Sequence, residues 1–226
     1  MTKVILADRS PRFGGRQNCV VRVESDDGEV VGDDTPWAPW SPNEVASRLS
    51  GSPARWYVVA GWAVDLFLGR QTRAHHDIEI GVARDDFPVL RSSFIEFDFD
   101  VVGSGRRWPL SSSAFDEHFQ TWLRDADTGE YHLDVFRDPH EGQEWICRRD
   151  TRIRLPYDEV VRVTETGIPY MSPEIVLLFK AKHLREKDQL DFNELLPLLN
   201  ERQIEWLRSS LELVHPDHPW TTIIRQ

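Results

Sequence analysis

Short apolar runs alternate with helically spaced apolar sets in the first half of the chain. Trp56–Val59 is an apolar run with the length and composition of a buried strand. Gly61 permits a tight turn, and Trp62–Leu68 has the apolar spacing of a helix. After a polar loop, Asp77–Val82 predicts a second strand. The order of strand, glycine turn, helix and strand predicts an α/β arrangement in this part of the chain.

The middle of the chain alternates with period two, which is typical of strands that cover a core with one face. This alternation occurs in "FDFDVV", in "HFQTWLRD" and in "YHLDVFRD". A further strand run is predicted over "EWICRRDTRIRL", and a hairpin is predicted around "TETG". Together these segments predict a mostly antiparallel or mixed sheet.

Helix-start signals stand on both sides of this sheet region. Ser41 at a cap position and Pro42 in the first turn predict a helix over about residues 42–50. Ser172 and Pro173 repeat the signal before a long stretch of helical periodicity, and a second capped amphipathic helix follows it. The last quarter of the chain is therefore predicted to be helical.

These patterns predict an α/β (α+β) chain in which a mixed sheet is flanked by helices and followed by a C-terminal helical region. The predicted divisions are an N-terminal extension over 1–36, a main domain over 37–165 and the helical region over 166–226. Within the extension, the residues around Asp27 and Gly28 are compatible with a hairpin and also with a loose acidic leader.

Composition and charge limit the classes of partner. The chain has 226 residues, of which 40% are hydrophobic, and this is adequate for a globular core. The net charge of -11 argues against binding to duplex nucleic acid or to an anionic membrane, because both need a basic face. No apolar run approaches the length of a membrane-spanning helix. The two cysteines, Cys19 and Cys147, form no CxxC pair, so we predict a cytoplasmic protein.

Three carboxylates stand in predicted strands, where unpaired charge is costly. Asp77 and Glu79 are two residues apart, so a strand places both on one face. Asp134 has a similar setting between Leu133 and Val135. Neighbouring carboxylates repel each other and raise one pKa unless a cation neutralises them. A hard divalent ion with oxygen ligands, Mg2+ in particular, fits such a group.

Basic side chains offer a second explanation for the same carboxylates. Arg73, His75 and Arg137 are nearby in the sequence and could form ordinary ion pairs with them. The order of parts favours the metal, because a glycine turn and a helix start upstream of the acidic pair offer backbone N–H groups to phosphate. Both explanations stay open at this point.

Aromatic residues are a further source of candidate chemistry, since nine tryptophans occur in the chain. Trp37, Trp40, Trp108 and Trp122 either line an acceptor or base pocket or belong to the core and its rim. The glycine-rich "GSGRRWPL", residues 103–110, is either an acceptor or phosphate loop or a solvated connection.

A resemblance to a known family connects these features. "AGWAVDLFLGRQTRAHHDIEI" followed by "YHLDVFR" resembles the nucleotidyltransferase superfamily, in particular the branch with lincosamide nucleotidyltransferases and aminoglycoside 2''-adenylyltransferases. The pattern of that branch runs G-G-W-x-x-D, then T-R-x-H, then D-x-D or D-x-E, and a later single Asp. The resemblance covers about residues 55–137 and extends more weakly to "FKAKHLREKDQLDF". It implies a nucleotidyltransferase-type sheet.

The resemblance also implies a role for each matching residue. The catalytic residues and the metal ligands would be the same three: Asp77, Glu79 and Asp134. The nucleotide would be bound by Ala60, Gly61, Trp62, Arg73, His75, Lys180 and Lys187. Asp65 is expected to interact with N–H groups near the start of its own helix. Two positions depart from the pattern, because Ala60 replaces the usual first glycine and Glu79 replaces the commoner Asp.

The implied reaction is Mg2+-dependent transfer of a nucleoside monophosphate to a hydroxyl of a small molecule. The donor would be ATP or another nucleoside triphosphate, and pyrophosphate would leave. The expected acceptor is an antibiotic of the aminoglycoside or lincosamide type, and neither duplex nucleic acid nor a membrane is an expected partner. Two alternatives are a toxin-like nucleotidyltransferase that modifies protein or RNA, and a catalytically degenerate protein that binds a nucleotide or a partner. The oligomeric state does not follow from the sequence.

Overall fold

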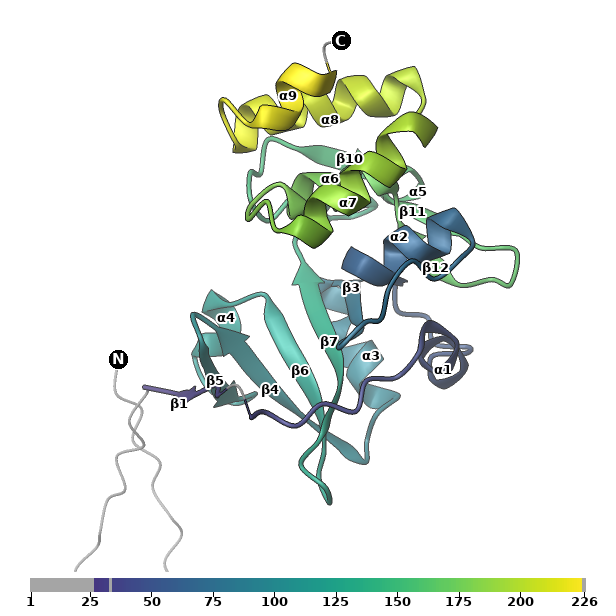
Figure 1. Ribbon diagram of the computed structural model, residues 1–226. Coiled ribbons are helices and arrows are strands. Elements are labelled where there is room, and N and C mark those ends of the chain that lie inside the picture. The colour runs from purple at the N-terminus through teal and green to yellow at the C-terminus, as the bar shows by residue number, and fades with distance from the viewer. Residues whose placement is uncertain (1–26, 33, 225–226) are drawn as a thin grey trace, which may run out of the picture.

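A nine-stranded mixed sheet is the largest element of the computed structural model, which describes residues 27–32 and 34–224 (Figure 1). In sheet order the strands are β1 (Glu29–Val30), β5 (Arg106–Pro109), β4 (Phe97–Gly103), β6 (Gln120–Asp125), β7 (Tyr131–Asp138), β3 (Glu79–Ala83), β2 (Trp56–Val58), β12 (Pro169–Met171) and β11 (Val161–Val163). Most neighbours are antiparallel, but β2 is parallel to β12 and β3 is parallel to β7. The predicted mixed sheet with flanking helices is confirmed.

The remaining elements are a small second sheet and the helices. The second sheet has the order β10 (Arg154–Pro156), β9 (Glu144–Ile146) and β8 (His140–Glu141). The helices are α1 (Pro42–Arg48), α2 (Ala60–Leu68), α3 (Phe87–Ser92), α4 (Ala114–Glu117), α5 (Tyr157–Val160), α6 (Pro173–Lys180), α7 (Glu186–Leu195), α8 (Glu201–Val214) and α9 (Pro219–Ile224). None of these described helices is long and apolar enough to cross a membrane.

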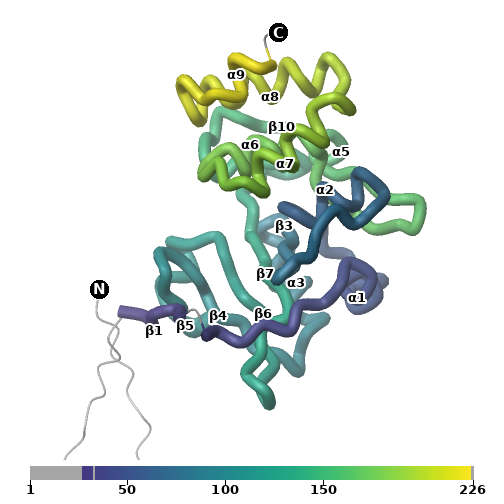
Figure 2. The backbone as a smooth tube through the Cα atoms, in the orientation of Figure 1, coloured from purple at the N-terminus to yellow at the C-terminus, as the bar shows by residue number. Residues whose placement is uncertain are grey.

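The C-terminal helices form a separate layer at one end of the molecule. Figures 1 and 2 show α6, α7, α8 and α9 together at the top of the view, while β1, β5 and β4 lie at the opposite end of the large sheet. Helix α2 packs against α6, α7 and β12, so it lies between this helical layer and the sheet. The predicted helical last quarter is thus confirmed from Pro173 onward.

Local sequence signals account for several of these elements. Ser41 and Glu44 form the reciprocal cap of α1, since Glu44 N donates to Ser41 Oγ and Ser41 N donates to the Glu44 carboxylate. Asn200 and Gln203 make the same arrangement at α8. Such caps contribute about 1 kcal/mol each to helix stability. The "TETG" turn joins β11 to β12, as the pattern predicted.

Several expectations need correction. Asp77 is not part of a buried strand, because it is exposed and β3 begins at Glu79. The run "EWICRRDTRIRL" contains two strands, β9 and β10, and is not one strand. The glycine-rich "GSGRRWPL" is mostly strand and not loop, because Arg106–Pro109 form β5 in a hairpin with β4, and its exposed turn is limited to Ser104 and Gly105.

The N-terminal extension and the predicted domain boundary show two further features. The residues before Asp27 that would form the first half of a hairpin, with Cys19 among them, lie outside the described residues. The other half, β1, pairs with β5. Strand β12 belongs to the predicted helical region over 166–226, yet it pairs with β2 in the large sheet. The sheet therefore extends across that predicted boundary.

Candidate active site

Two neighbouring parallel strands carry the central carboxylates. Glu79 of β3 and Asp134 of β7 are directly opposite each other in the register of this pair. The bond from Asp134 N to the carbonyl of Ile78, 2.9 Å long, continues the pairing one residue beyond β3. Asp77 precedes the strand, and its charge acts on both Glu79 and Asp134. The fold therefore brings the three predicted carboxylates into one place.

The basic side chains that were candidates to neutralise these carboxylates have other partners. Arg137 is buried and donates to the carbonyls of Phe115 and His118. Arg73 lies 3.1 Å from the Nδ1 atom of His75. Among the ion pairs of the described residues, none includes any of the three carboxylates. The explanation by ordinary ion pairs is therefore wrong.

Asp134 is the most constrained of the three. It is 5% exposed, and its Oδ2 accepts a hydrogen bond of 2.6 Å from Gln120 Nε2. Its Oδ1 is buried and has no hydrogen-bond partner. Burial raises the pKa of Asp134 well above its usual value, and the charge of Glu79 raises it further. A buried acceptor without a hydrogen-bond partner lowers the stability of the folded state unless a ligand donates to it or coordinates it.

Glu79 shows the same electrostatic pattern. Burial raises its pKa to about 7, and the charge of Asp77 adds to this effect. Lys180, Arg148 and Lys187 act in the opposite direction, but they do not restore the ordinary value. Both strand-borne carboxylates therefore have raised pKa values as long as only protein groups surround them.

The donor set fits a hard divalent cation such as Mg2+. All three groups offer carboxylate oxygens, and one of these oxygens, Asp134 Oδ1, has no protein partner. Within residues 27–32 and 34–224, no three His, Cys, Asp or Glu side chains lie in an arrangement that could hold a metal ion by themselves. Mg2+ usually keeps water and phosphate oxygens among its ligands, so an incomplete protein shell suits a metal that arrives with a nucleotide.

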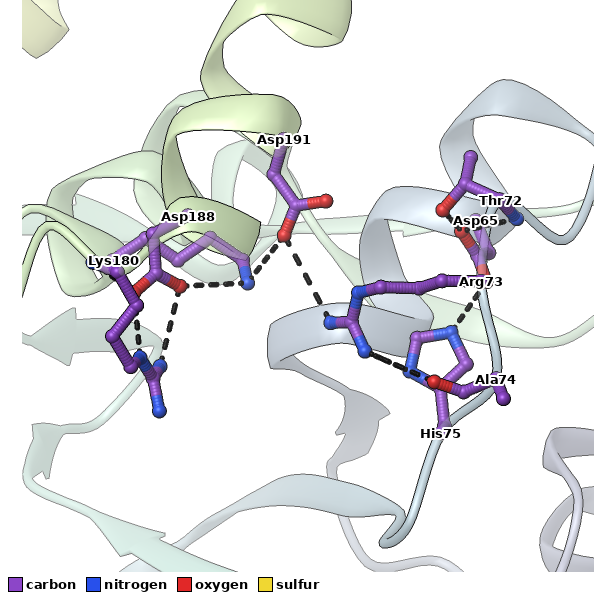
Figure 3. Close-up of polar contacts among 9 residues, drawn as sticks. Asp65, Thr72, Arg73, Ala74, His75, Lys180, Asp188 and Asp191 are labelled. Atoms are coloured by element: carbon purple, nitrogen blue, oxygen red, sulfur yellow. Dashed lines mark hydrogen bonds and ion pairs between the residues drawn. The ribbon is translucent and has the colours of Figure 1, made fainter.

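A hydrogen-bond network fastens the loop before β3 to α2 (Figure 3). Asp65 is buried, and its Oδ1 accepts from Thr72 N at 3.1 Å and from Thr72 Oγ1 at 2.5 Å. Its Oδ2 lies 2.5 Å from His75 Nε2. The structural role expected for Asp65 is correct, but its partners are the loop residues and not the N–H groups of its own helix.

The partners of His75 determine its tautomer. Nδ1 faces Arg73, which can only donate, and Nε2 faces Asp65, so a neutral ring protonated at Nε2 satisfies both contacts. Burial lowers the pKa of His75, and the charge of Arg73 lowers it further, although Asp65 opposes them. His75 and Arg73 thus hold the loop in place, and their contact with a nucleotide stays a prediction.

Trp62 and Gly61 complete the connection between α2 and the loop. The Trp62 ring stacks on His75 with centroids 4.3 Å apart, and its Nε1 donates to the carbonyl of Asp77 at 3.2 Å. A methyl group at Gly61 would lie 2.3 Å from an Arg73 nitrogen and 2.8 Å from the His75 ring. Glycine is required here because the loop side chains pack directly over it.

Lys180 lies in a different electrostatic setting from the one expected. It is 7% exposed, with its Nζ 2.6 Å from Asp191 Oδ2 and 3.5 Å from Asp188 Oδ1. Asp188 also accepts from Arg185 Nε at 2.7 Å. Asp191 lies between Lys180 and Arg73, which is 3.9 Å away, as Figure 3 shows. These ion pairs join α6 and α7 to the loop before β3.

The start of α7 presents exposed cations toward the carboxylates. Lys187 is exposed, and its charge acts on Glu79. Arg185 is exposed as well, and the charges of Glu79 and Asp77 are among those that raise its pKa, after its bond to Asp188. The carboxylates of the sheet and the cations of α7 thus face one site from two sides.

Comparison with known families places the chain. A sequence model described as aminoglycoside-2''-adenylyltransferase matches residues 43–195, which is more than half of the 226 residues and includes the three carboxylates. The chain belongs to this family. It is therefore a nucleotidyltransferase, as the resemblance predicted. A comparison with curated proteins found no match.

Three solved structures show a partial likeness to this aminoglycoside-2''-adenylyltransferase family member. The lincosamide antibiotic adenylyltransferase LnuA with lincomycin bound is 18% identical with a TM-score of 0.49, over 70% of this chain and 95% of that one. ANT(2'')-Ia in complex with adenylyl-2''-tobramycin is 15% identical with a TM-score of 0.43, over 81% and 91%. An antigenic nucleotidyltransferase-like protein from Paracoccidioides brasiliensis is 16% identical with a TM-score of 0.43, over 83% and 94%.

Ala60 is the position where this family member departs from the glycine of the pattern. Its φ is +53°, in the left-handed region that favours glycine. Ala60 therefore adopts a backbone conformation that favours glycine, at a cost in strain. Its contact with a nucleotide stays a prediction.

A hollow of about 580 Å³ lies away from the carboxylates, between the segment that contains α5 and β11 and helix α8. Arg162, Glu174 and Trp206 are among the residues that line it. None of the predicted site residues lines this hollow. The carboxylates are the stronger candidate for the active site, because the paired register and the unsatisfied oxygen are chemical features, whereas the hollow is a feature of shape alone.

The sequence analysis missed two residues of the site. Gln120 donates to Asp134, and Arg185 stands beside the predicted Lys187. The alternation of "HFQTWLRD" placed Gln120 on one face of a strand, but only the pairing of β6 with β7 shows which carboxylate it meets. No signal in the sequence identified Arg185.

Proposed function

We propose that the protein uses Mg2+ and ATP to transfer AMP to a hydroxyl of a small cationic molecule of the aminoglycoside or lincosamide type. The observation that carries this proposal is the group of three carboxylates, Asp77 just before β3, Glu79 on β3 and Asp134 on β7, none of which forms an ion pair among the described residues. Family membership gives the reaction class. We also place the protein in the cytoplasm, because its two cysteines form no disulfide framework.

The metal and the nucleotide would meet at the carboxylates. Asp77, Glu79 and Asp134 would hold the divalent cation, which supplies charge neutralisation at the phosphoryl oxygens. Lys187 and Arg185 are exposed on the same side and are suited to bind the anionic pyrophosphate portion of the nucleotide. Lys180 is engaged by two carboxylates, so its contribution is a positive charge held close to Glu79.

Asp134 is the best candidate for the base that activates the acceptor. Burial and the charge of Glu79 raise its pKa in the metal-free protein, so the group readily holds a proton. Gln120 holds one of its oxygens and leaves the other one, Oδ1, without a partner. The acceptor hydroxyl would give its proton to this oxygen.

A cationic acceptor agrees with the charge of the protein. The net charge of -11 attracts positively charged molecules to the surface and repels nucleic acid. The structure of LnuA contains lincomycin, and the structure of ANT(2'')-Ia contains adenylyl-2''-tobramycin. Lincomycin and tobramycin are therefore the first acceptors to test.

The test measures ATP binding by thermal shift with and without Mg2+, in wild type, Asp77→Asn and the control Asp127→Asn. Asp77 and Asp127 are both exposed, so neither substitution should disturb the core. A ligand at about a hundred times its Kd adds about 2.7 kcal/mol to the free energy of unfolding. We expect this gain with Mg2+ in wild type and in Asp127→Asn, and its loss in Asp77→Asn.

Mass spectrometry of ATP reactions with tobramycin and with lincomycin then identifies the acceptor by the added adenylyl group. No ATP shift in wild type would contradict the proposal and leave a protein that has the fold without the activity. A shift without product on either antibiotic, but with label transferred to protein or RNA, would support the toxin-like alternative.

A further inference from the structure

The large sheet places a tryptophan directly beside the proposed base. Cross-strand register puts Glu79 opposite Asp134, Asp134 opposite Trp122 of β6, and Trp122 opposite Asp100 of β4. Residues that are directly opposite on neighbouring strands project from the same face. The Trp122 side chain therefore lies next to Asp134, on the side away from Glu79.

Two hydrogen-bonding groups on these neighbours are unsatisfied. Asp134 Oδ1 is an acceptor, Trp122 Nε1 is a donor, and both atoms are buried without a hydrogen-bond partner. The other oxygen of Asp134 is taken by Gln120. Hydrogen bonding from the Trp122 side chain is among the influences that lower the pKa of Asp134 against the effect of burial, so the N–H lies on the side of the carboxylate, but the two groups do not reach the geometry of a direct hydrogen bond. Buried donors and acceptors without partners are rare and costly.

The next residue of the row does not share this property. Asp100 Oδ2 accepts from the Tyr131 hydroxyl at 2.6 Å and from Arg124 Nε at 3.1 Å. Along this row of opposed residues, the unsatisfied groups are therefore those of Asp134 and Trp122. A ligand that meets this part of the sheet is recognised at these two atoms.

Aromatic neighbours hold the Trp122 ring in place. Trp37 and Tyr131 each lie 5.1 Å from it, centroid to centroid, in edge-on contacts. Trp37 belongs to the segment between β1 and α1, which runs along β7 and is tied to it by a bond of 2.9 Å from Ala38 N to the Tyr131 carbonyl (Figure 1). The indole N–H is therefore fixed before any ligand arrives.

A hydroxyl group is complementary to this pair, because it offers one donor and also accepts. We propose that Trp122 is a positioning residue for the acceptor: its Nε1–H donates to the oxygen of the acceptor hydroxyl while that hydroxyl donates to Asp134 Oδ1. This inference rests on the proposed function. It assigns the selection of an alcohol group to one tryptophan and one aspartate.

The chemical step follows from this arrangement. The hydroxyl oxygen forms a bond to the α-phosphorus of ATP, and its proton passes to Asp134 Oδ1. The bond from the α-phosphorus to the oxygen that bridges it to the β-phosphorus breaks, and pyrophosphate leaves with that electron pair. Trp122 keeps its own proton and directs the oxygen lone pair that attacks.

The test compares Trp122→Phe with Trp37→Phe in steady-state kinetics, with tobramycin or lincomycin as acceptor. Trp122→Phe removes the N–H and keeps an aromatic ring, whereas Trp37→Phe makes the same change in the ring that packs against it. We expect Trp122→Phe to raise the acceptor KM by about tenfold, the usual scale for one lost hydrogen bond to a buried group. The ATP KM and the Tm should stay within twofold and a few degrees of wild type.

The outcomes separate this inference from the proposed function. An unchanged acceptor KM in Trp122→Phe, with product still formed, would overturn the role of Trp122 and leave the proposed function standing. Equal changes in acceptor KM in Trp122→Phe and Trp37→Phe would overturn it as well, because packing alone would then account for the effect. Failure of the wild type to bind ATP with Mg2+ would overturn both.

Discussion

Two groups of buried carboxylates in this protein differ in their electrostatic state. Asp188 on α7 is fully buried, and burial would raise its pKa, but its hydrogen bond to Arg185 and the charge of Lys180 lower it overall. Asp134 on β7 is 5% exposed, and burial together with the charge of Glu79 raises its pKa well above the usual value. The same residue type at similar burial is thus held as an anion in one place and resists ionisation in the other.

The difference separates carboxylates with structural ion pairs, on α7, from carboxylates without ion pairs, on β3 and β7, which are candidates to bind a ligand. On α6 and α7 the cations needed by the carboxylates come from the protein itself. On β3 and β7, Gln120 donates to one oxygen of Asp134, and no ion pair of the described residues includes Glu79 or Asp134. The proposed function assigns the neutralising cation to a bound metal ion. Burial alone therefore does not mark a carboxylate as a candidate site residue, and the absence of an ion pair within the described part of the chain is the feature that separates Asp134 from Asp188.

The largest loss of stability should come from removing Lys180 from its ion pairs with Asp188 and Asp191. Lys180→Met should lower the free energy of unfolding by about 3 kcal/mol, because it removes one cation from two buried carboxylates and keeps the length of the side chain. Lys187→Met is the matched control, since Lys187 is exposed and its removal should cost less than about 0.5 kcal/mol. Urea denaturation of both variants measures the difference, and equal effects would contradict the structural role of Lys180.

Neutralising Glu79, which has no ion-pair partner among the described residues, should raise the free energy of unfolding, by less than Lys180→Met lowers it. The pKa of Glu79 is raised from 4.5 to about 7 by burial and by Asp77. Below pH 4.5, the pKa of Glu79 in the unfolded chain, both the folded and the unfolded states hold the proton, and Glu79 does not lower the free energy of unfolding. As the pH rises from 4.5 toward 7, Glu79 ionises in the unfolded chain before it ionises in the folded protein, so the free energy of unfolding falls. Above the pKa of the folded state, this loss of stability is complete and stays constant. Glu79→Gln escapes this penalty.

Denaturation at two pH values tests this sign. At pH 8 and without metal, Glu79→Gln should be more stable than wild type by about 2 kcal/mol, and near pH 4 the two should be equal. Mg2+ with ATP should remove the advantage at pH 8 by stabilising only the wild type. Glu96→Gln, at an exposed position, should show no gain at either pH. A gain for Glu79→Gln that is the same at both pH values would refute the electrostatic explanation.

The two groups also differ in how far the sequence could reveal them. Asp77, Glu79 and Asp134 were found because carboxylates within apolar strand patterns are unusual, and the strand, turn and helix around Gly61 are local features. The opposition of Glu79 and Asp134 could not be derived in this way, because it depends on the parallel pairing of strands that are far apart in the chain.

The paired group was harder to foresee for the same reason. Lys180 and Asp188 lie on different helices, and helical periodicity assigned the charges of "FKAKHLREKDQLDF" to an ordinary polar face. The bend between α6 and α7 turns Lys180 back toward Asp191, so it forms the centre of an ion-pair network. Long-range register and the folding of one helix against another are therefore what the pattern alone leaves undetermined.

The smallest predicted change in stability concerns the turn that leads from β2 into α2, close in the chain to the carboxylates without ion pairs. Ala60 has a φ of +53°, where a residue with a Cβ is strained by about 1–2 kcal/mol. Glycine removes the strain but adds freedom to the unfolded chain, which offsets part of the gain. Ala60→Gly should therefore raise the free energy of unfolding by about 0.5 kcal/mol.

Ala63→Gly is the matched control, because Ala63 lies inside α2, is buried, and has no positive φ. The same change there should lower the free energy of unfolding by about 1 kcal/mol. A loss of similar size in Ala60→Gly would mean that the left-handed turn is not strained. If Ala60→Gly is more stable and also shows a larger shift with ATP and Mg2+, the methyl group of Ala60 hinders the nucleotide. An unchanged ATP shift would mean that the backbone conformation, which alanine and glycine share, is what this turn contributes to the site.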